Sequence, residues 1–188
     1  RRRLSGDGGP ARWASGPASG MVPPMIKQGD PLPDATLSES LAFGDACPMP
    51  PQKLSAAELA RGKRIVIFGL PGAFTPTCSG KHVPGYIEHL DALRAKGIDE
   101  VWCVSVNDGF VMAAWGREQG AIGKIRMLGD GSAELTRKLG LEVDIPGMGV
   151  RLRRCSLLVE DGVVTRVNLE DGPKFEVSDA ETMLKQLG

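Results

Sequence analysis

Three short apolar runs, each followed by a helical pattern, constrain the fold of this chain most strongly. The runs lie at Arg64–Phe68, Val101–Val106 and Ile125–Leu128, and β-branched residues recur in them. Runs of this length and composition predict buried strands. Strands that alternate with helices predict one sheet with helices on both of its faces. We therefore expect an α/β fold.

Helix signals follow the first and third runs. A helix is expected from about Cys78 to Lys96, where Gly97 ends it, with a bend at Pro84 inside it. A shorter helix is expected over Ser132–Leu139, closed by Gly140. Both segments would connect successive strands, as an α/β fold requires.

The second run leads into another helix signal. The pair Asn107-Asp108 offers an N-cap for a helix that runs to about Gln119. Its apolar side chains fall at helical spacing, and they are Phe110, Val111, Ala114 and Trp115. This stripe predicts the face that packs on the sheet.

Turn and capping signals place the remaining elements. The capping boxes Ser55–Glu58 and Ser178–Glu181 predict the starts of a short helix and of the last helix. The segments Cys155–Glu160 and Val163–Leu169 are joined by Asp161-Gly162, which predicts a β-hairpin. The expected order is β-α-β-α-β-α-β-β-α, which gives a central mixed sheet with an antiparallel end.

The N-terminal segment differs in composition from the rest of the chain. Residues 1–24 begin with three arginines and continue with Gly, Ser, Ala and Pro, with almost no apolar periodicity. We expect a disordered tail there and one domain over residues 25–188. The segment has no apolar core typical of a secretory signal, and it fits a transit-peptide remnant or a vector-derived remnant equally well.

Charge and composition exclude several function classes. Lys+Arg and Asp+Glu number 23 each, so the formal net charge is zero, and no basic excess favours a nucleic-acid partner. No apolar run approaches the roughly 18 residues of a membrane span, so no membrane partner is expected. The four cysteines are too few for a secreted disulfide scaffold and include no CxxC pair. A cytoplasmic location is expected, or a mitochondrial or chloroplast location if the tail is a transit remnant.

The segment Leu70–Ser79 carries the chemistry. It follows a buried strand and opens a helix, so Cys78 is expected in the first helical turn, where free N–H groups and the helix dipole favour the nucleophilic thiolate. Pro71 and Pro76 stiffen the loop, and the Thr75 hydroxyl precedes the sulfur by three residues. From these residues alone, Cys78 is equally well explained as a small buried apolar residue.

A family resemblance bears on this choice. The pattern Pro71-x-x-x-Thr75-x-x-Cys78 matches the PxxxTxxC active-site signature of peroxiredoxins, and the fuller string with Lys81–Gly85 resembles the peroxiredoxin 5 or type II branch, in its bacterial or plant-like form. The segments Ser105–Asp108 and Gly149–Arg154 extend a likeness that covers residues 25–188. It implies a thioredoxin-like fold and a thiol peroxidase that reduces hydrogen peroxide and alkyl hydroperoxides without a metal or organic cofactor.

The same resemblance implies roles for four residues. Cys78 would be the peroxidatic cysteine, Thr75 would hydrogen-bond the peroxide and the sulfur, and Pro71 would shield the sulfenic acid from water. Arg154 would be the active-site arginine, although Arg151 and Arg153 are neighbours that a shifted register would put in its place. A guanidinium beside the sulfur favours the anion and can hold the peroxide oxygens.

Regeneration of Cys78 leaves alternatives open. Cys103 lies 25 positions later, a spacing that resembles type II members in which this cysteine is proposed to resolve the sulfenic acid, yet it falls inside an expected buried strand. The C-terminal resolving cysteine of the animal branch corresponds here to Val177. Cys155 is interpreted as a packing residue and Cys47 as a bystander. Without a resolving cysteine, glutathione with glutaredoxin, or thioredoxin, would attack Cys78 directly.

Other expectations concern ligands and partners. His82 and His89 bring no third ligand onto one helix face, so no metal is expected, and His82 is expected to orient the helical turn. A homodimer through Phe74, Pro76 and the Gly147–Val150 loop is expected from the resemblance. Two alternatives remain: a redox-sensing or holdase protein that uses the same thiol, and a thioredoxin-fold binding module with an ordinary thiol.

Overall fold

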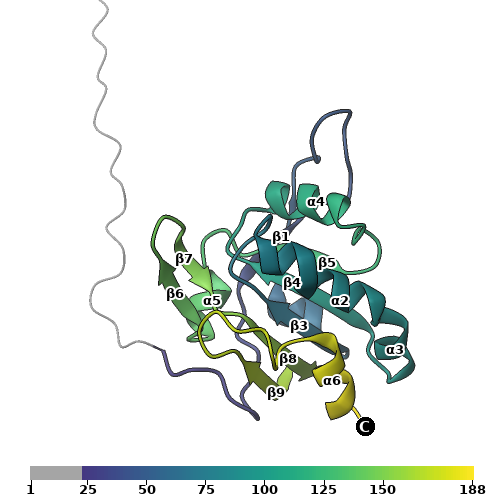
Figure 1. Cartoon of the computed structure of the whole chain (residues 1–188), viewed down its shortest axis with the longest axis vertical. Coiled ribbons are helices and arrows are strands. Elements are labelled where there is room, and N and C mark those ends of the chain that lie inside the picture. Colours follow the sequence, from purple (N-terminus) through teal and green to yellow (C-terminus); the bar gives the residue numbers. More distant parts are fainter. Residues whose placement is uncertain (1–22) are drawn as a thin grey trace, which may run out of the picture.

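The computed structural model describes residues 23–188 and places the three apolar runs at the centre of one sheet. They form β3 (Arg64–Gly69), β4 (Glu100–Ser105) and β5 (Arg126–Gly129), which pair in parallel in the order β5-β4-β3. The whole sheet has seven strands in the order β2-β1-β5-β4-β3-β8-β9 (Figure 1). The prediction of a mixed sheet with an antiparallel end is confirmed.

The antiparallel end is the predicted hairpin. Strand β8 (Cys155–Glu160) pairs with β3 on one side and with β9 (Val163–Leu169) on the other, antiparallel in both cases. Asp161 and Gly162 connect the two strands with φ angles of 47° and 77°. Positive φ at both positions gives a turn whose twist matches that of the strands, which explains the Asp-Gly pair.

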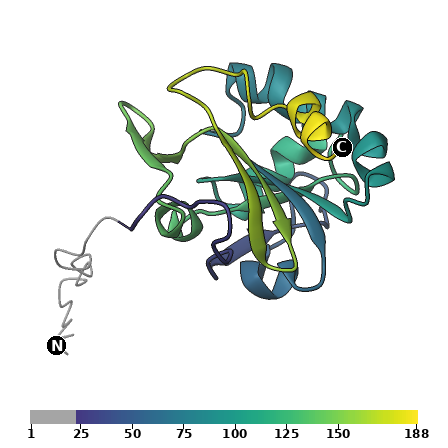
Figure 2. The same ribbon diagram turned by 90° about the horizontal axis from the view of Figure 1, so that it is seen from below.

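The sequence patterns missed four short strands. Strands β1 (Thr36–Glu39) and β2 (Gln52–Ser55) extend the other edge of the sheet, and β6 (Glu142–Ile145) and β7 (Gly149–Leu152) form a separate hairpin. Each has four residues, which is too short for a clear period-2 signal. The β6–β7 hairpin stands apart from the sheet in Figures 1 and 2.

Helices cover both faces of the sheet. Helices α1 (Ala56–Ala60) and α5 (Glu134–Lys138) pack on one face, in the apolar cluster that contains Ile65 and Ile67. The other face carries α2 (Val83–Glu88), α3 (Leu90–Ala95), α4 (Gly109–Glu118) and α6 (Ala180–Gln186). Figure 2 shows α6, in yellow, and α1 on opposite sides of the sheet. Successive residues of β3 thus point into different halves of the core.

The long helix predicted over residues 78–96 is interrupted. It consists of a π-helical turn, η1 (Cys78–His82), then α2 and α3, with a break at His89 rather than at Pro84. Pro84 lies in the first turn of α2, and the Val83 N–H bonds to the Cys78 carbonyl five residues earlier. A widened turn before Pro84 relieves the clash between the proline ring and the carbonyl four residues earlier.

The capping predictions are confirmed in part. Ser55 accepts from Glu58 N–H at the start of α1, and Asp108 accepts from Val111 N–H at the start of α4. The last helix, however, is capped by Asp179 and not by Ser178. The Ser178 hydroxyl instead donates to a buried carboxylate, Glu170, so it is not available as a cap.

The predicted apolar stripe of α4 is confirmed as buried only at Trp115. Met112, Ala113 and Gly116 are buried with it, whereas Phe110 is 46% exposed and Val111 and Ala114 are half-buried. Gly116 allows the side chain of Met127 in β5 to pack directly against the helix backbone. Helix α4 therefore packs against the sheet through the face that includes Gly116, and Phe110 lies on the surface.

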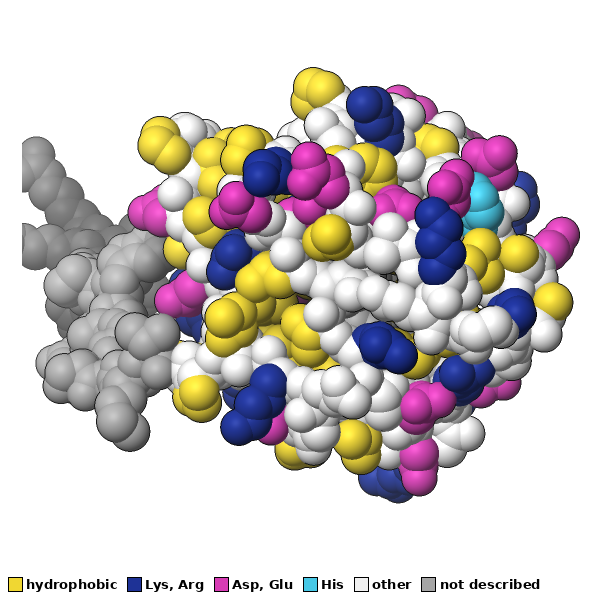
Figure 3. All heavy atoms as spheres, turned by 60° about the horizontal axis from the view of Figure 1, so that its bottom comes forward, with side chains coloured by type: hydrophobic (Ala, Val, Ile, Leu, Met, Phe, Trp, Pro, Cys, Tyr) yellow, Lys and Arg dark blue, Asp and Glu magenta, His cyan; other side chains and the backbone are white. Residues whose placement is uncertain are grey.

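The expectation of a tail over residues 1–24 falls almost entirely on residues 1–22, which lie outside the described part. Within residues 23–188, no helix is long and apolar enough to cross a membrane. Charged side chains of both signs are interspersed with hydrophobic ones on the face in Figure 3.

Candidate active site

The loop after β3 leads directly into the helical segment that contains Cys78. Helical backbone begins at Pro76, and the Thr75 carbonyl accepts the first helical hydrogen bond, from Ser79 N–H at 2.9 Å. Cys78 is fully buried in this first turn, as the sequence predicts. The backbone N–H groups of such a turn favour an anion at this position.

Asn107, two residues after β4, holds this loop in place. Asn107 accepts at its Oδ1 from the backbone N–H of Ala73 at 3.0 Å and from the Ser105 hydroxyl at 2.7 Å. Asn107 is predicted only as one half of a capping pair, whereas Asp108 alone caps α4. The side-chain carbonyl of Asn107 therefore ties the Cys78 loop to the neighbouring parallel strand.

Arg154 is the arginine that lies at the sulfur. It follows β7, and its Nη2 donates to Cys78 Sγ at 3.4 Å, although the two residues lie 76 positions apart. Its Nη1 faces His82 Nδ1 at 3.0 Å. Its Nε is buried and has no hydrogen-bond partner in the described part of the chain. The guanidinium therefore contacts both the sulfur and the imidazole and has one buried N–H donor without a partner in the described residues.

His82 is fixed as a neutral side chain. It is fully buried, and burial, with Arg154 beside it, lowers its pKa from 6.5 to about 3. A neutral imidazole carries one N–H, so Nε2 donates to the Ser178 carbonyl at 3.2 Å and Nδ1 accepts from Arg154. The expectation that His82 orients the helical turn omits this contact with the arginine. His82 is thereby placed to orient the guanidinium.

A buried carboxylate holds the loop that contacts the histidine. Glu170 Oε1 accepts from the backbone N–H groups of residues 176–178 and from the Ser178 hydroxyl, all within 2.9 Å. Burial by itself raises the pKa of Glu170, but these hydrogen bonds hold it below its ordinary value. The ionised carboxylate therefore orders the loop whose carbonyl, at Ser178, holds His82.

Thr75 and Pro71 lie at the mouth of the site. The Thr75 hydroxyl donates to the Gly72 carbonyl at 2.8 Å rather than to the sulfur, so its oxygen remains available as an acceptor. Pro71 is half-buried, and its carbonyl accepts from Arg151 Nη1 at 3.4 Å. Arg151 also donates to the Met148 carbonyl at 3.0 Å. Arg151 therefore ties the β6–β7 hairpin to the Pro71 loop.

A cavity of 520 Å³ opens beside these residues. It is bounded by the Cys78 loop, the β6–β7 hairpin, the two arginines before β8 and the 172–173 turn. Its lining residues are Pro71, Thr75, Pro76, Thr77, Val143, Ile145, Met148, Arg153, Arg154, Gly172 and Pro173.

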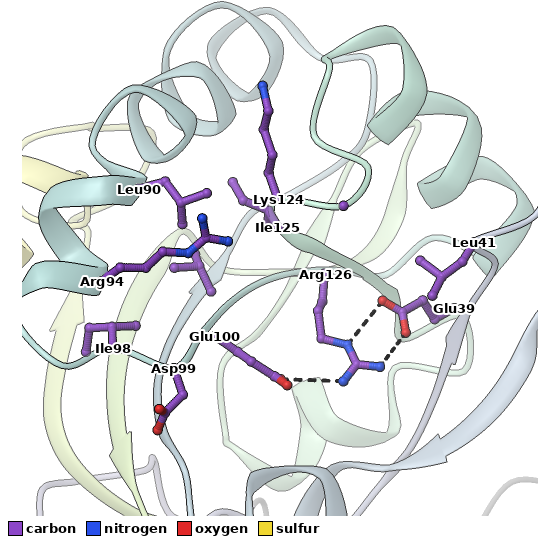
Figure 4. Close-up of a pocket in the computed structure, with 12 residues that line it drawn as sticks. Glu39, Leu41, Leu90, Arg94, Ile98, Asp99, Glu100, Lys124, Ile125 and Arg126 are labelled. Carbon is purple, nitrogen blue, oxygen red and sulfur yellow. Dashed lines mark hydrogen bonds and ion pairs between the residues drawn. The ribbon is translucent and has the colours of Figure 1, made fainter.

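A smaller hollow of 260 Å³ at the opposite ends of the parallel strands has a different character (Figure 4). There Glu39 holds Arg126 with a contact of 2.6 Å, and Glu100 lies 3.5 Å from the same guanidinium. Arg126 is thus already neutralised by two carboxylates, and no thiol lines this hollow. The chemistry that the cysteine segment predicts belongs to the larger cavity.

The other cysteines have distinct environments. Cys103 lies in β4 and Cys155 in β8, and both are buried. Burial raises the pKa of Cys103 well above its ordinary value, with the neighbouring Cys78 adding to the effect, and burial raises the pKa of Cys155 to about 12. Cys47 is exposed. Cys103 and Cys155 are therefore thiols, not thiolates, at neutral pH, and no disulfide joins any of the four cysteines.

The buried, neutral histidine predicts a pH dependence of stability. Between pH 6.5 and about 3 the unfolded chain binds a proton at His82 that the folded chain does not bind, so the free energy of unfolding falls as the pH is lowered through this window. We expect His82→Asn, which keeps a hydrogen-bond acceptor, to show a smaller loss between about pH 7 and about pH 5. Urea unfolding of both proteins measures this loss, and equal losses would contradict the assignment.

Comparisons with known proteins agree with the geometry of this site. The Redoxin family model matches residues 27–184. Peroxiredoxin-2E-2, chloroplastic, of Oryza sativa subsp. japonica is 51% identical over 168 residues, which cover 86% of this chain and 72% of the relative. Peroxiredoxin-2B of Arabidopsis thaliana is 49% identical over 164 residues, which cover 86% of this chain and 98% of the relative.

A solved structure is similar to this chain both in fold and in sequence. Reduced Prx3 of Vibrio vulnificus, crystallised with hydrogen peroxide, superposes with a TM-score of 0.80 at 47% identity over 87% of this chain and all of the other. The sheet order and the helices on both faces are therefore those of a thioredoxin-like peroxiredoxin fold. Because the family model matches residues 27–184 and the sequence and structural similarities cover 86% and 87% of the chain, the chain belongs to the peroxiredoxin family, in its type II branch, and is a thiol peroxidase.

Proposed function

We propose that Cys78 is the peroxidatic residue and that the enzyme reduces hydrogen peroxide and alkyl hydroperoxides. The observation that carries this proposal is the guanidinium of Arg154, buried at 3.4 Å from a sulfur in the first turn of a helix. The guanidinium and the helix start both favour the thiolate, which is the nucleophilic form. The relative from Vibrio vulnificus that was crystallised with hydrogen peroxide supports the choice of substrate.

The reaction needs only groups of this site. The Cys78 thiolate attacks the terminal oxygen of ROOH, an S–O bond forms, and the O–O bond breaks. The sulfur is oxidised by two electrons to a sulfenic acid, and the leaving alkoxide or hydroxide takes a proton from solvent to give an alcohol or water. Thr75 Oγ1 accepts from the hydroperoxide proton, while Arg154 Nε–H and Nη2–H donate to the oxygens, where negative charge develops.

Loss of peroxide over time, with dithiothreitol as the reductant, tests this proposal. We expect repeated turnovers per chain with hydrogen peroxide and with tert-butyl hydroperoxide. A single oxidation of each chain without further turnover, together with suppression of aggregation of a client protein, would instead support the alternative of a redox-sensing or holdase protein.

The reductant is proposed to be glutathione with glutaredoxin, or thioredoxin. Cys103 is the candidate resolving cysteine, but it is buried in the middle of β4. A disulfide with Cys78 requires the Cα atoms to come within about 7 Å and the first helical turn to open locally. We therefore propose that direct attack on Cys78 by an external thiol is the main route of regeneration.

Substitution of the candidate resolving cysteine separates these routes. Cys103→Ser is expected to leave turnover supported by glutathione and glutaredoxin within about twofold of the wild-type rate and to reduce turnover supported by thioredoxin, since only the latter would use an internal disulfide. Steady-state peroxide consumption with each system measures this. Loss of turnover with both reductants would mean that Cys103 resolves Cys78 in every cycle.

The assembly is proposed to be a homodimer through the loops around the site. Phe74 is 52% exposed, and Phe110 is 46% exposed. The ring of Phe74 lies 6.4 Å from that of Trp115, so this apolar surface adjoins α4. Exposed aromatic side chains are typical of interface centres. A sedimentation mass of one chain rather than two would contradict the proposal.

We propose that residues 25–188 form the catalytic domain and that the enzyme acts in the cytoplasm, with a mitochondrial or chloroplast location as the alternative. The relatives include proteins named as chloroplastic and as mitochondrial. Imaging of a fluorescent fusion, with and without residues 1–24, distinguishes a transit remnant from a segment without a targeting role.

A further inference from the structure

The cavity beside Cys78 is far larger than hydrogen peroxide requires. Its volume is 520 Å³, whereas a water molecule, close in size to the smallest peroxide, takes up only about 30 Å³ in the liquid. Cavities of this size are typical of sites for organic ligands. The space beyond Thr75 and Arg154 therefore fits the organic group of a larger hydroperoxide.

The wall of this space is apolar on the side of the β6–β7 hairpin. Val143 and Ile145 from β6 and Met148 from the connecting turn line it, opposite Pro71 and Pro76 of the Cys78 loop. The three hairpin side chains are half-buried, so they remain accessible to a ligand. An apolar body in this position would remove both surfaces from water.

The charge of the cavity is unbalanced. Its lining includes two arginines and no acidic side chain. Arg154 is already engaged, with the Cys78 sulfur at 3.4 Å and His82 Nδ1 at 3.0 Å. Arg153 has only a contact of 3.4 Å from Nη2 to the Glu170 backbone carbonyl, and no acidic side chain lies within 4 Å of it in the described part of the chain. One guanidinium beside an apolar cavity therefore lacks an anion.

We propose that Arg153 binds the carboxylate of an organic hydroperoxide whose apolar body lies against the β6–β7 hairpin. The inference rests on the proposed function and narrows its substrate class to apolar hydroperoxides that carry a carboxylate. The guanidinium offers paired N–H donors that match a carboxylate. The chemical step is unchanged: the thiolate takes the terminal oxygen, and the leaving alkoxide retains the carboxylate on Arg153. Arg153 is thus a residue for specificity, outside the bonds that form and break.

A matched pair of substrates tests this proposal. The reduced full-length chain is mixed in a stopped-flow instrument with cumene hydroperoxide, or with its para-carboxylated derivative, without any reductant, so that only the first oxidation is observed. We expect the carboxylated compound to react about five to ten times faster, the size of a partly exposed charged contact. Added salt is expected to reduce this ratio because it screens the contact.

Substitution assigns the ratio to one residue. Arg153→Gln is expected to bring it to about one, while the rate constants for hydrogen peroxide and cumene hydroperoxide stay within about twofold of wild type. Arg166→Gln, which removes an exposed arginine of β9, serves as the matched control and should keep the wild-type ratio. Ile145→Ala should slow both organic substrates equally, since it removes part of the apolar wall.

Two results would overturn the assignment: a ratio at or below one in the wild-type protein, or a ratio that survives in Arg153→Gln. If Arg153→Gln does not fold, Arg153→Lys provides the same test, because it keeps the charge and loses the paired donors, so an intermediate ratio is expected. If hydrogen peroxide itself does not react with the reduced protein, the proposed function fails, and the assignment of Arg153 fails with it.

Discussion

Replacing Cys78 with serine is expected to lower peroxide turnover by at least about a thousandfold, because a serine hydroxyl is not ionised at neutral pH and cannot take over the role of the thiolate nucleophile. The substitution is nearly isosteric, and the Arg154 guanidinium, which lies 3.4 Å from the sulfur, can donate to the buried hydroxyl, so the fold should persist. Steady-state consumption of hydrogen peroxide with excess dithiothreitol measures the loss.

The exposed cysteine provides the matched control. Cys47→Ser removes a thiol that is more accessible than Cys78 and should leave turnover unchanged. If accessibility alone decided reactivity, this variant would be the one that loses activity. Undiminished turnover in Cys78→Ser would end the proposal that this sulfur attacks the peroxide.

Replacing Arg154 with glutamine is expected to lower the rate of Cys78 oxidation by about 100- to 1,000-fold, the range found when a preorganised donor to a developing anion is removed. Two losses combine: the positive charge at 3.4 Å from the sulfur, and the buried Nε–H that is free to donate to the peroxide. Stopped-flow measurement of the first oxidation isolates this step from regeneration.

Two further substitutions distinguish the effect of the guanidinium from the effect of positive charge alone. Arg154→Lys keeps a cation but loses the paired donors, so we expect it to recover only part of the lost rate. Arg166→Gln removes an exposed charge and should have no effect on this rate. A rate in Arg154→Gln within about threefold of wild type would show that the transition state does not depend on this side chain.

The central strands and the cysteine segment could be predicted because their signals are local. Strands β3, β4 and β5 appear as apolar runs, and the position of Cys78 follows from a strand, a proline-rich loop and a helix that are adjacent in sequence. The hairpin β8–β9 is set by two turn residues with positive φ. Such features depend on a few neighbouring residues, and tertiary packing does not override them.

The support around the arginine could not be predicted because it joins distant segments. Arg154 and His82 lie 72 positions apart, and His82 and Ser178 lie 96 positions apart. Helical periodicity places His82 on a face but does not reveal that its partner is a guanidinium. Only the family resemblance, and no period or spacing, points to Arg154 ahead of Arg151 and Arg153.

The β6–β7 hairpin has only a partial signal in the sequence. Glu142–Ile145 alternates polar and apolar residues, as a half-buried strand does, but four residues are too few to decide between a strand and a loop. The consequence is functional, since this hairpin forms the apolar wall of the cavity beside Cys78. The width of the substrate site therefore becomes visible only in the structure.

Mass spectrometry of the reduced protein, after one equivalent of hydrogen peroxide in the presence of dimedone, tests the central claim most directly. The account predicts one dimedone adduct per chain, located on Cys78, because the sulfenic acid forms where the guanidinium and the helix start stabilise the thiolate. Adducts located on Cys47, Cys103 or Cys155, with Cys78 unmodified, would contradict it.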